Sequence, residues 1–438
     1  MQNNVPTRIA NILMNALKGG VVPRVGLEYV TVGRAQEIDA ILHDIDMIMD
    51  GSASFRFIVG KYGSGKSFLL QTIRNYATAK GFAVVDADLS PERRFAGTKG
   101  QGLATYKELI QNLSTKSKPD GGALPLVLEK WISGIQASIK AECDADGDAF
   151  DLLVEKQIYA AAGSLEGMVN GFEFAKAIIL YWRAYKQDDA AQKSNVLKWF
   201  RGEYASRKES KADLDINFIV NDETWYDFLK ILAAFLVSAG YKGLLVVIDE
   251  LVNIFKIPNS ITRQNNYEKI LTMYNDVLQG KAKHIGFLMG GTPQCLEDKY
   301  KGVFSYEALR SRLAEGHFAT DDIKDLSAPI IRLQMLTQEE MYILVEKLRD
   351  IHAQLYRYTP AISHDELLYF LTVEYNRVGA ETHITPREII RDFIELVNIL
   401  HQNPQKTIAE ILGSNSFEMA KGGLSEADIH SDFLEFEI

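Results

Sequence analysis

One short stretch of the chain has glycines, a lysine and a serine in the order that phosphate binding requires. Residues 60–67 are Gly-Lys-Tyr-Gly-Ser-Gly-Lys-Ser, which matches the pattern G-x-x-x-x-G-K-[ST]. In such a loop the glycines let backbone N–H groups turn toward a phosphate chain, and the following helix adds the positive end of its dipole. An apolar run at 55–59 and a helix-like segment at 68–74 flank it. The sequence therefore predicts a phosphate-binding loop between a strand and a helix.

The predicted ligand of this loop is a nucleoside triphosphate with Mg²⁺. We expect the ammonium group of Lys66 to contact the β- and γ-phosphates and to assist catalysis, and the hydroxyl of Ser67 to bind the metal ion. The residues predicted to bind the nucleotide are Gly60, Lys61, Tyr62, Gly63, Ser64, Gly65, Lys66, Ser67 and Phe68.

Two adjacent carboxylates, Asp249 and Glu250, follow a long apolar run at 243–248. A buried strand of a parallel sheet has this composition, and ligands bind at the carboxyl ends of such strands. We expect Asp249 to hold Mg²⁺, usually through water, and Glu250 to act as the general base toward the attacking water. The alternative is a strand that ends in two solvated acids.

Three further side chains suit a phosphoryl-transfer site. Thr292 ends the predicted strand at 284–293, and its hydroxyl is predicted to sense the γ-phosphate or the lytic water; alternatively it starts a turn with Pro293. Arg310 and Arg312 lie near the end of a predicted helix, where they point in nearly opposite directions. We expect at most one of them to stabilise charge on a phosphoryl group bound by a neighbouring subunit. The alternative is that both form surface ion pairs.

Apolar runs predict the strands that carry these residues, and helical periodicity fills most of the segments between them. The predicted strands are 55–59, 82–89, 243–250, 284–293 and 329–333. The first two enclose a helix, so they form a βαβ unit and predict a parallel, largely buried sheet. From 101 to 240 the pattern is helical, with loops at 117–122 and at the charged stretch Arg201–Asp215.

The same periodicity divides the chain into four parts. An N-terminal helical segment covers 1–28, and an α/β core covers 29–335 with a large helical insertion at about 102–218. A C-terminal helical region covers 336–402, and a tail covers 403–438. The insertion accounts for the long separation between the phosphate-binding loop and the two carboxylates.

Composition argues against several other classes of protein. The chain has 48 Lys and Arg against 58 Asp and Glu, a net charge of −10, so no overall field attracts DNA or an anionic membrane. No apolar run reaches the length of about 18 residues that spans a bilayer, and the first residues lack the layout of a signal peptide. The two cysteines lack metal-site spacing, which indicates reduced thiols and a cytoplasmic protein.

These features resemble the AAA+ branch of the P-loop NTPases, and more closely the ATP-binding proteins of bacterial BREX (bacteriophage exclusion) loci of the BrxD type. The resemblance covers roughly residues 8 to 400. It rests on Ala-Leu-Lys-Gly-Gly-Val-Val-Pro at 16–23, Val-Gly-Arg at 32–34, Val-Gly-Lys-Tyr-Gly-Ser-Gly-Lys-Ser-Phe-Leu-Leu at 59–70 and Val-Ile-Asp-Glu-Leu at 247–251.

The resemblance implies an AAA+ parallel-sheet core, the helical insertion and a C-terminal helical lid. In such proteins a segment like the one that holds Gly33 and Arg34 lies beside the adenine; the alternative is a plain turn into a helix. An arginine at the start of a lid helix, here Arg387, reaches back to the nucleotide; the alternative is a solvated first-turn arginine. These three residues are therefore expected to bind the cofactor.

The function implied is Mg-dependent binding and hydrolysis of ATP to ADP by an oligomer that serves anti-phage defence with other proteins of its operon. One alternative is a nucleotide-gated switch of the STAND type with little turnover. Another is a DNA-loading ATPase of the origin-recognition kind, which would add a winged helix after the lid; the stretch after His401 is too short for one. Contact with DNA through the insertion stays open, without support from the net charge.

Overall fold

The computed structural model describes residues 4–143, 146–163, 171–314, 325–360, 362–376 and 384–413. The chain forms two compact units. One is Arg34–Gln334, which we call the core unit, and the other combines Met1–Gly33 with Met335–Ile438 and is called the helical unit. The domain boundaries drawn from the sequence stay predictions, and residues 414–438 of the predicted tail lie outside the described residues.

A five-stranded sheet forms the centre of the core unit. Its strands are β1 (Ala53–Gly60), β2 (Ala83–Asp88), β3 (Leu244–Asp249), β4 (Ile285–Gly291) and β5 (Ile330–Leu333). They lie in the order β2-β3-β4-β1-β5, and each neighbouring pair is parallel. The predicted α/β fold with a parallel sheet is therefore confirmed.

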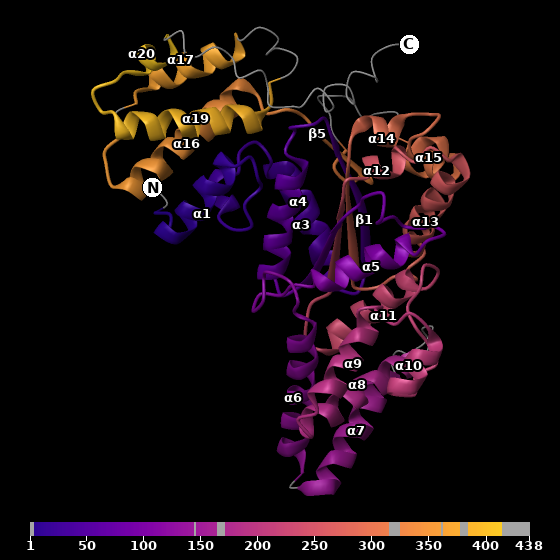
Figure 1. Ribbon diagram of the computed structural model, residues 1–438. Coiled ribbons are helices and arrows are strands. Elements are labelled where there is room, and N and C mark those ends of the chain that lie inside the picture. Colours follow the sequence, from indigo (N-terminus) through magenta and orange to yellow (C-terminus); the bar gives the residue numbers. More distant parts are fainter. Residues whose placement is uncertain are drawn as a thin grey trace. The chain divides into compact units, whose positions relative to one another are not determined.

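Helices cover both faces of this sheet, which explains why most residues of its strands are apolar. α3 (Ala35–Met49) and α4 (Lys66–Ala79) lie on one face (Figure 1). α11 (Trp225–Ser238) packs on β3 and α13 (Ser260–Leu278) packs on β1 as part of the other face. Fully burying one large apolar side chain contributes roughly 1.5–3 kcal/mol, so the two layers hold the sheet between them. The buried side chains of the first layer include Ile41, Ile45, Leu69, Ile73, Val84, Leu245 and Val247.

The segment between β2 and β3 is helical, as the sequence predicts. Its helices before α11 are α5 (Gln101–Gln111), α6 (Leu124–Glu142), α7 (Gly147–Gly163), α8 (Gly171–Lys186), α9 (Ala190–Phe200) and α10 (Arg207–Leu214). Figure 1 shows α6 to α10 extending away from the sheet as a bundle. The bundle has an aromatic core, in which the ring of Phe174 lies 5.1 Å from that of Phe200. The Phe174 ring also lies 5.3 Å from that of Phe235 on α11.

The predicted loop at Arg201–Asp215 is wrong in its second half, where α10 forms. Only Ser210 and Leu214 of this helix are buried, so it lacks the apolar stripe from which a helix is predicted. A local signal was nevertheless present, because the hydroxyl of Ser206 caps the helix by accepting from the Glu209 N–H at 3.2 Å.

Short helices follow the carboxyl ends of β3 and β4. They are α12 (Val252–Phe255), α14 (Pro293–Glu297), the 3₁₀ turn η1 (Val303–Ser305) and α15 (Glu307–Leu313). They place the residues after Asp249 and Thr292 on compact turns at the edge of the sheet where ligands of parallel sheets bind.

Every described secondary-structure element of the helical unit is a helix. They are α1 (Thr7–Lys18), α2 (Leu27–Val30), α16 (Gln338–Tyr356), α17 (His364–Tyr375), α19 (Pro386–Gln402) and α20 (Ile408–Leu412). α1 packs against α16 and α19, and α17 packs against α16 and α20. Thr337 and Thr385 begin α16 and α19 with capping boxes. In the described parts of both units, no helix is long and apolar enough to cross a membrane.

Candidate nucleotide site

The predicted phosphate-binding loop connects the end of β1 to the start of α4. Gly63 and Gly65 have φ angles of 81° and 84°, a left-handed conformation that costs glycine little. A Cβ atom added to Gly60 would lie 2.3 Å from the Ser64 Oγ and 3.0 Å from the Leu333 carbonyl oxygen. The three glycines therefore let the loop fold tightly against the end of the sheet.

Lys66 begins α4 and its side chain turns back over the loop. The ammonium nitrogen donates to the carbonyl oxygens of Gly60 at 2.8 Å and Lys61 at 3.0 Å. Burial lowers the pKa of Lys66, and the nearby Asp249 and Glu250 oppose this shift. A partly desolvated cation held above a loop of backbone N–H groups suits a polyphosphate, because anionic oxygens would restore the solvation that the cation has lost.

The hydroxyl of Ser67 donates to Asp249 Oδ2 at 2.7 Å, which joins the start of α4 to the end of β3. The other carboxylate oxygen, Oδ1, accepts from the Glu250 N–H at 2.8 Å. Gly290 on β4 lies against the same carboxylate, since an added Cβ atom would be 2.2 Å from Oδ1. The carboxylate is therefore fixed by groups on α4, on β4 and directly after β3.

Glu250 follows Asp249 with a φ angle of 63°, a conformation that is uncommon for a residue with a side chain. Burial raises the pKa of Glu250, and the charges of Asp249 and Asp88 raise it further. A carboxylate with raised pKa accepts protons more readily, which suits a general base. Such strained positions occur often at functional sites.

Asp88, the last residue of β2, is a further acid at this site that was not predicted from the sequence. It stands opposite Asp249 in the register of β2 and β3. Burial raises the pKa of Asp88, and the charge of Asp249 adds to the shift. The sequence places Asp88 near the end of the predicted strand 82–89, but that it stands beside Asp249 follows only from the order and register of the strands.

Thr292 follows β4, the strand between β3 and β1, and therefore lies at this edge as predicted from the sequence. Its hydroxyl oxygen accepts from the Cys295 N–H at 3.3 Å and caps α14. Burial raises the pKa of the Cys295 thiol to about 11, so this cysteine is a neutral packing residue. Thr292 thus has the helix-starting contact of the alternative interpretation, and its role as a sensor stays a prediction.

Arg34 precedes α3 and contacts the loop through its side chain. Its Nη2 donates to the carbonyl oxygens of Ser64 at 3.0 Å and Gln334 at 2.6 Å. Gly33 and Arg387 belong to the helical unit, where Arg387 lies beside Gly20. The predicted contacts of Gly33 and Arg387 with a nucleotide stay predictions.

The exposed members of the predicted set lie on the surface of the core unit. The side chain of Tyr62, at the tip of the loop, is 61% exposed. Arg310 on α15 forms an ion pair with Glu307 at 3.3 Å. Arg312 donates to the Asn275 Oδ1 at 3.0 Å and to the Ala308 carbonyl at 2.7 Å. Of the two arginines, Arg312 is held more closely by its own chain.

The donor atoms of Ser67 and Asp249 fit a magnesium ion. Both are oxygens, which hard divalent cations prefer, and Mg²⁺ beside a nucleotide needs only one or two protein ligands in addition to phosphates. In the described part of the chain, no cluster of three or more His, Cys, Asp or Glu residues could hold a metal ion alone. The residues present therefore fit a metal ion that arrives with a polyphosphate.

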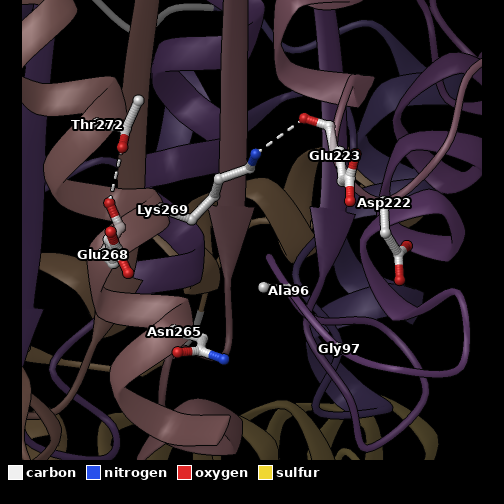
Figure 2. A pocket seen from close by; sticks show the side chains of 8 residues that line it. All are labelled: Ala96, Gly97, Asp222, Glu223, Asn265, Glu268, Lys269 and Thr272. Atoms are coloured by element: carbon white, nitrogen blue, oxygen red, sulfur yellow. Dashed lines mark hydrogen bonds between the residues drawn. The ribbon is translucent and has the colours of Figure 1, made fainter. Parts of the chain in front are cut away.

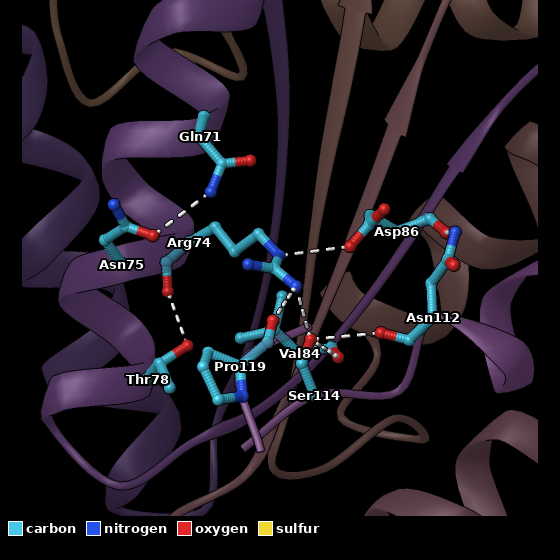
Figure 3. Close-up of polar contacts among 9 residues, drawn as sticks. All are labelled: Gln71, Arg74, Asn75, Thr78, Val84, Asp86, Asn112, Ser114 and Pro119. Atoms are coloured by element: carbon cyan, nitrogen blue, oxygen red, sulfur yellow. Dashed lines mark hydrogen bonds and ion pairs between the residues drawn. The ribbon is translucent and has the colours of Figure 1, made fainter. Parts of the chain in front are cut away.

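A buried arginine on α4 fixes the helix that carries Lys66 and Ser67. Figure 3 shows Arg74 directed at β2 and at the loop before α6. Its Nε donates to Asp86 Oδ1 at 3.0 Å, and its Nη2 donates to Ser114 Oγ at 2.6 Å and to the Pro119 carbonyl at 2.9 Å. Because these bonds join α4 to a strand and a loop, the start of α4 is held in a defined position.

The core unit also has a polar cavity of about 320 Å³. It is lined by Ala96, Gly97, Asp222, Glu223, Asn265, Glu268, Lys269 and Thr272 (Figure 2). Lys269 extends toward the end of the segment before α11 and donates to the Glu223 carbonyl at 3.0 Å. Burial lowers the pKa of Lys269. None of the residues predicted to bind nucleotide lines this cavity.

Comparison with known proteins identifies the family. The family described as BREX system ATP-binding protein BrxC/D matches residues 5–416, so the match includes the loop, the two carboxylates and the insertion. No curated protein matches the chain. The resemblance inferred from the sequence is confirmed: the chain belongs to the family of BREX system ATP-binding proteins BrxC/D.

Proposed function

We propose that this protein binds ATP with Mg²⁺ and hydrolyses it to ADP. The observation that carries the proposal is the hydrogen bond between Ser67 Oγ and Asp249 Oδ2 at 2.7 Å, which joins two segments 182 positions apart in the sequence. A hydroxyl and a carboxylate at this separation form an oxygen site beside a phosphate-binding loop. Glu250, a candidate base, follows directly in the chain.

Each residue of the site would have a separate role. The backbone of the loop and the Lys66 ammonium bind the phosphates, and Ser67 with Asp249 holds the metal ion. When bound, Mg²⁺ neutralises negative charge on the phosphate oxygens. Glu250 orients the attacking water and accepts its proton. Thr292, Arg34 and Arg387 are proposed to respond to the nucleotide.

We further propose that the protein acts as a homo-oligomer, with other proteins of a BREX anti-phage system as partners. Support comes from the family and from α15, which presents Arg310 on the surface with 46% of its side chain exposed. We also propose that the protein is cytoplasmic, as predicted from the sequence. The two cysteines of the chain, Cys143 and Cys295, are free thiols, which supports this location.

The test is steady-state ATP hydrolysis by the wild type and by Glu250→Gln, over a range of protein concentrations and with or without duplex DNA. We expect Glu250→Gln to retain ATP binding and to lose about 10²–10⁴-fold in turnover, the usual contribution of a general base. Glu203→Gln, at an exposed glutamate, is the matched control and should hydrolyse ATP at the wild-type rate.

The outcomes separate the hydrolysing oligomer from the alternatives. Specific activity that rises with protein concentration supports catalysis completed between subunits. Tight nucleotide binding without turnover under every condition would refute the ATPase and leave the nucleotide-gated switch. Equal turnover in the wild type and in Glu250→Gln would show that another group activates the water.

A further inference from the structure

Arg34 is buried in the core unit, where a charged side chain is unfavourable unless hydrogen bonds compensate for the lost water. The residue is only 7% exposed, and arginine is seldom buried unless its charge has partners. It occupies the residue before the first turn of α3, and its guanidinium group, which has only donor N–H groups, cannot cap the N–H groups of that helix. α3 itself is fixed against the sheet by Ile41 and Ile45. The guanidinium group is thus attached to a fixed helix, and it donates to backbone carbonyls outside that helix.

One nitrogen of this group serves two segments of backbone. Arg34 Nη2 donates to the carbonyl oxygen of Ser64, inside the phosphate-binding loop, at 3.0 Å. The same atom donates to the carbonyl oxygen of Gln334 at 2.6 Å. Hydrogen bonds from a charged donor are about twice as strong as neutral ones, and these are partly or fully buried. The arginine therefore restrains both segments.

The two segments leave the sheet side by side. Gly60, which begins the loop, is paired with Leu333 in the register of β1 and β5, and Gln334 is the next residue after β5. Arg34 and Gln334 are also the first and last residues of the core unit. Both points at which the chain passes into the helical unit are therefore joined to each other, and to the loop, by this side chain.

We infer that Arg34 is a positioning residue, which holds the phosphate-binding loop through the Ser64 carbonyl and couples it to the two chain connections between the units. This inference rests on the proposed binding of ATP. It differs from the adenine contact expected from the sequence, because the side chain acts on the loop backbone instead of the base. A change in the loop on nucleotide binding would then be transmitted to the backbone at Gln334.

The test compares Arg34→Gln and Arg34→Lys with the wild type. Arg207→Gln, at an exposed arginine of α10, is the matched control. Amide hydrogen exchange without nucleotide should be about 10-fold faster at residues 61–66 and near Gln334 in Arg34→Gln than in the wild type. Arg34→Lys should recover most of the protection, since its single nitrogen can donate to both carbonyls. Circular dichroism verifies that each variant is folded.

Nucleotide affinity gives the second readout. Arg34→Gln should weaken the binding of fluorescent analogues of ATP, ADP and GTP by the same factor, about 10-fold, because the loop contacts phosphates that all three share. Unchanged exchange in Arg34→Gln would overturn the inference, and so would a loss confined to the adenine nucleotides, which indicates a base contact. If the wild type binds no nucleotide, the proposed function fails, and the exchange measured without nucleotide still decides whether Arg34 holds the loop.

Discussion

Gly290 has no side chain, and the carboxylate of Asp249 occupies the space that a side chain would need. An added Cβ atom would lie 2.2 Å from Asp249 Oδ1 and 3.0 Å from a methyl carbon of Leu70. Because β3 and β4 are neighbours in the sheet, neither strand can shift to relieve this overlap without breaking backbone hydrogen bonds. The position of the carboxylate therefore depends on a glycine from a different strand.

Replacing Gly290 by alanine should displace this carboxylate. We expect ATP turnover by Gly290→Ala to fall about 10²-fold, since a misplacement of about 1 Å has effects of this size. Overpacking should also lower the free energy of unfolding by about 1–3 kcal/mol. Turnover and urea unfolding measure the two effects.

The matched control is Gly134→Ala in α6, where an added Cβ atom meets open space. This change should raise the free energy of unfolding by about 0.5–1 kcal/mol, because alanine favours the helix, and should leave turnover unchanged. Wild-type turnover in Gly290→Ala would mean that Asp249 has no place in the reaction.

At this scale, the sequence identifies residues that belong to contiguous motifs. The loop at 60–67 and the pair Asp249-Glu250 can be recognised without a structure, because each lies in a single segment with a known pattern. Gly290 and Asp88 escape selection because their importance depends on the neighbour of each strand and on register, which are properties of the sheet. The catalytic and binding roles themselves stay predictions.

A buried ion pair joins α3 to β1. Arg56 donates to both carboxylate oxygens of Asp44, with Nε to Oδ2 at 2.6 Å and Nη2 to Oδ1 at 2.7 Å. The two side chains are 10% and 4% exposed. Arg56 Nη1 also donates to the carbonyl of Ser327 at 2.6 Å, just before β5. One arginine thus connects a helix, a central strand and the approach to an edge strand.

Removing one partner of this pair should leave a buried charge without its counterion. We expect Asp44→Ala to lower the free energy of unfolding by about 3–5 kcal/mol. The double variant Asp44→Leu with Arg56→Met should lose less free energy of unfolding than the sum of the losses in Asp44→Leu and in Arg56→Met, because it leaves no uncompensated charge. Urea unfolding monitored by circular dichroism measures these differences.

Asp46, on the same helix, provides the control. It forms an exposed ion pair with Lys80, and such pairs contribute about 0–1 kcal/mol. Asp46→Ala should therefore change stability little. Equal losses for Asp44→Ala and Asp46→Ala would contradict the interpretation that burial decides the importance of the inner pair.

We expect His352 to make the stability of the helical unit depend on pH. It is 1% exposed, its Nδ1 lies 2.8 Å from the Tyr358 hydroxyl oxygen, and its ring centroid lies 5.9 Å from that of His401. Burial lowers the pKa of His352, the bond with Asn398 opposes this shift, and His401 adds to it. The folded unit therefore favours the neutral imidazole.

The sign of the effect follows from comparing the two states. Above about pH 6.5, the ordinary pKa of histidine, His352 is neutral in both states and stability is fully retained. Below it the unfolded chain binds a proton that the folded chain does not, so the free energy of unfolding falls as pH falls.

We expect unfolding measured at pH 7.5 and 5.5 to show this loss, and His352→Gln to reduce it. His43→Gln, at an exposed histidine of α3, should leave the pH dependence unchanged. If His352→Gln and the wild type lose the same free energy between the two pH values, other groups cause the dependence.

Elements differ in how well their sequences predict them. β3 and α16 are evident, one from its continuous apolar run and the other from periodicity and its cap at Thr337. α10 was missed because charged helix formers occupy most of it and only two of its residues are buried. A helix stabilised by a cap and a few contacts carries little periodic signal.

At the scale of the whole molecule, the sequence predicts individual helices and strands better than it predicts which distant helices pack together. The core with its helical insertion follows from local patterns. The packing of α1 against α16 and α19 brings the two ends of the described chain into one unit. No local sequence pattern predicts this packing. Pairing between distant amphipathic helices depends on shape and burial, which single segments do not encode.

The proposed association of several copies would let an arginine of one subunit act on the nucleotide of the next. Arg310 is the better candidate for an arginine that acts on a neighbouring subunit, since its ion pair with Glu307, whose side chain is 85% exposed, is a weak restraint. Arg312 is held by Asn275 and by a carbonyl of its own helix. Arg310→Ala should lower turnover about 10³-fold without weakening ATP binding, and Arg312→Ala should have a smaller effect.

Mixing two inactive variants separates action within a subunit from action between subunits. Glu250→Gln lacks the base but keeps Arg310, and Arg310→Ala lacks the arginine but keeps Glu250. If the arginine acts on a neighbour, some interfaces in the mixture combine an intact Glu250 with an intact Arg310, and activity should return. A mixture as inactive as its components would place Arg310 on its own subunit's nucleotide or on the surface. Recovered activity, in contrast, requires an assembly in which each site is completed by the next copy, because neither variant can supply both groups alone.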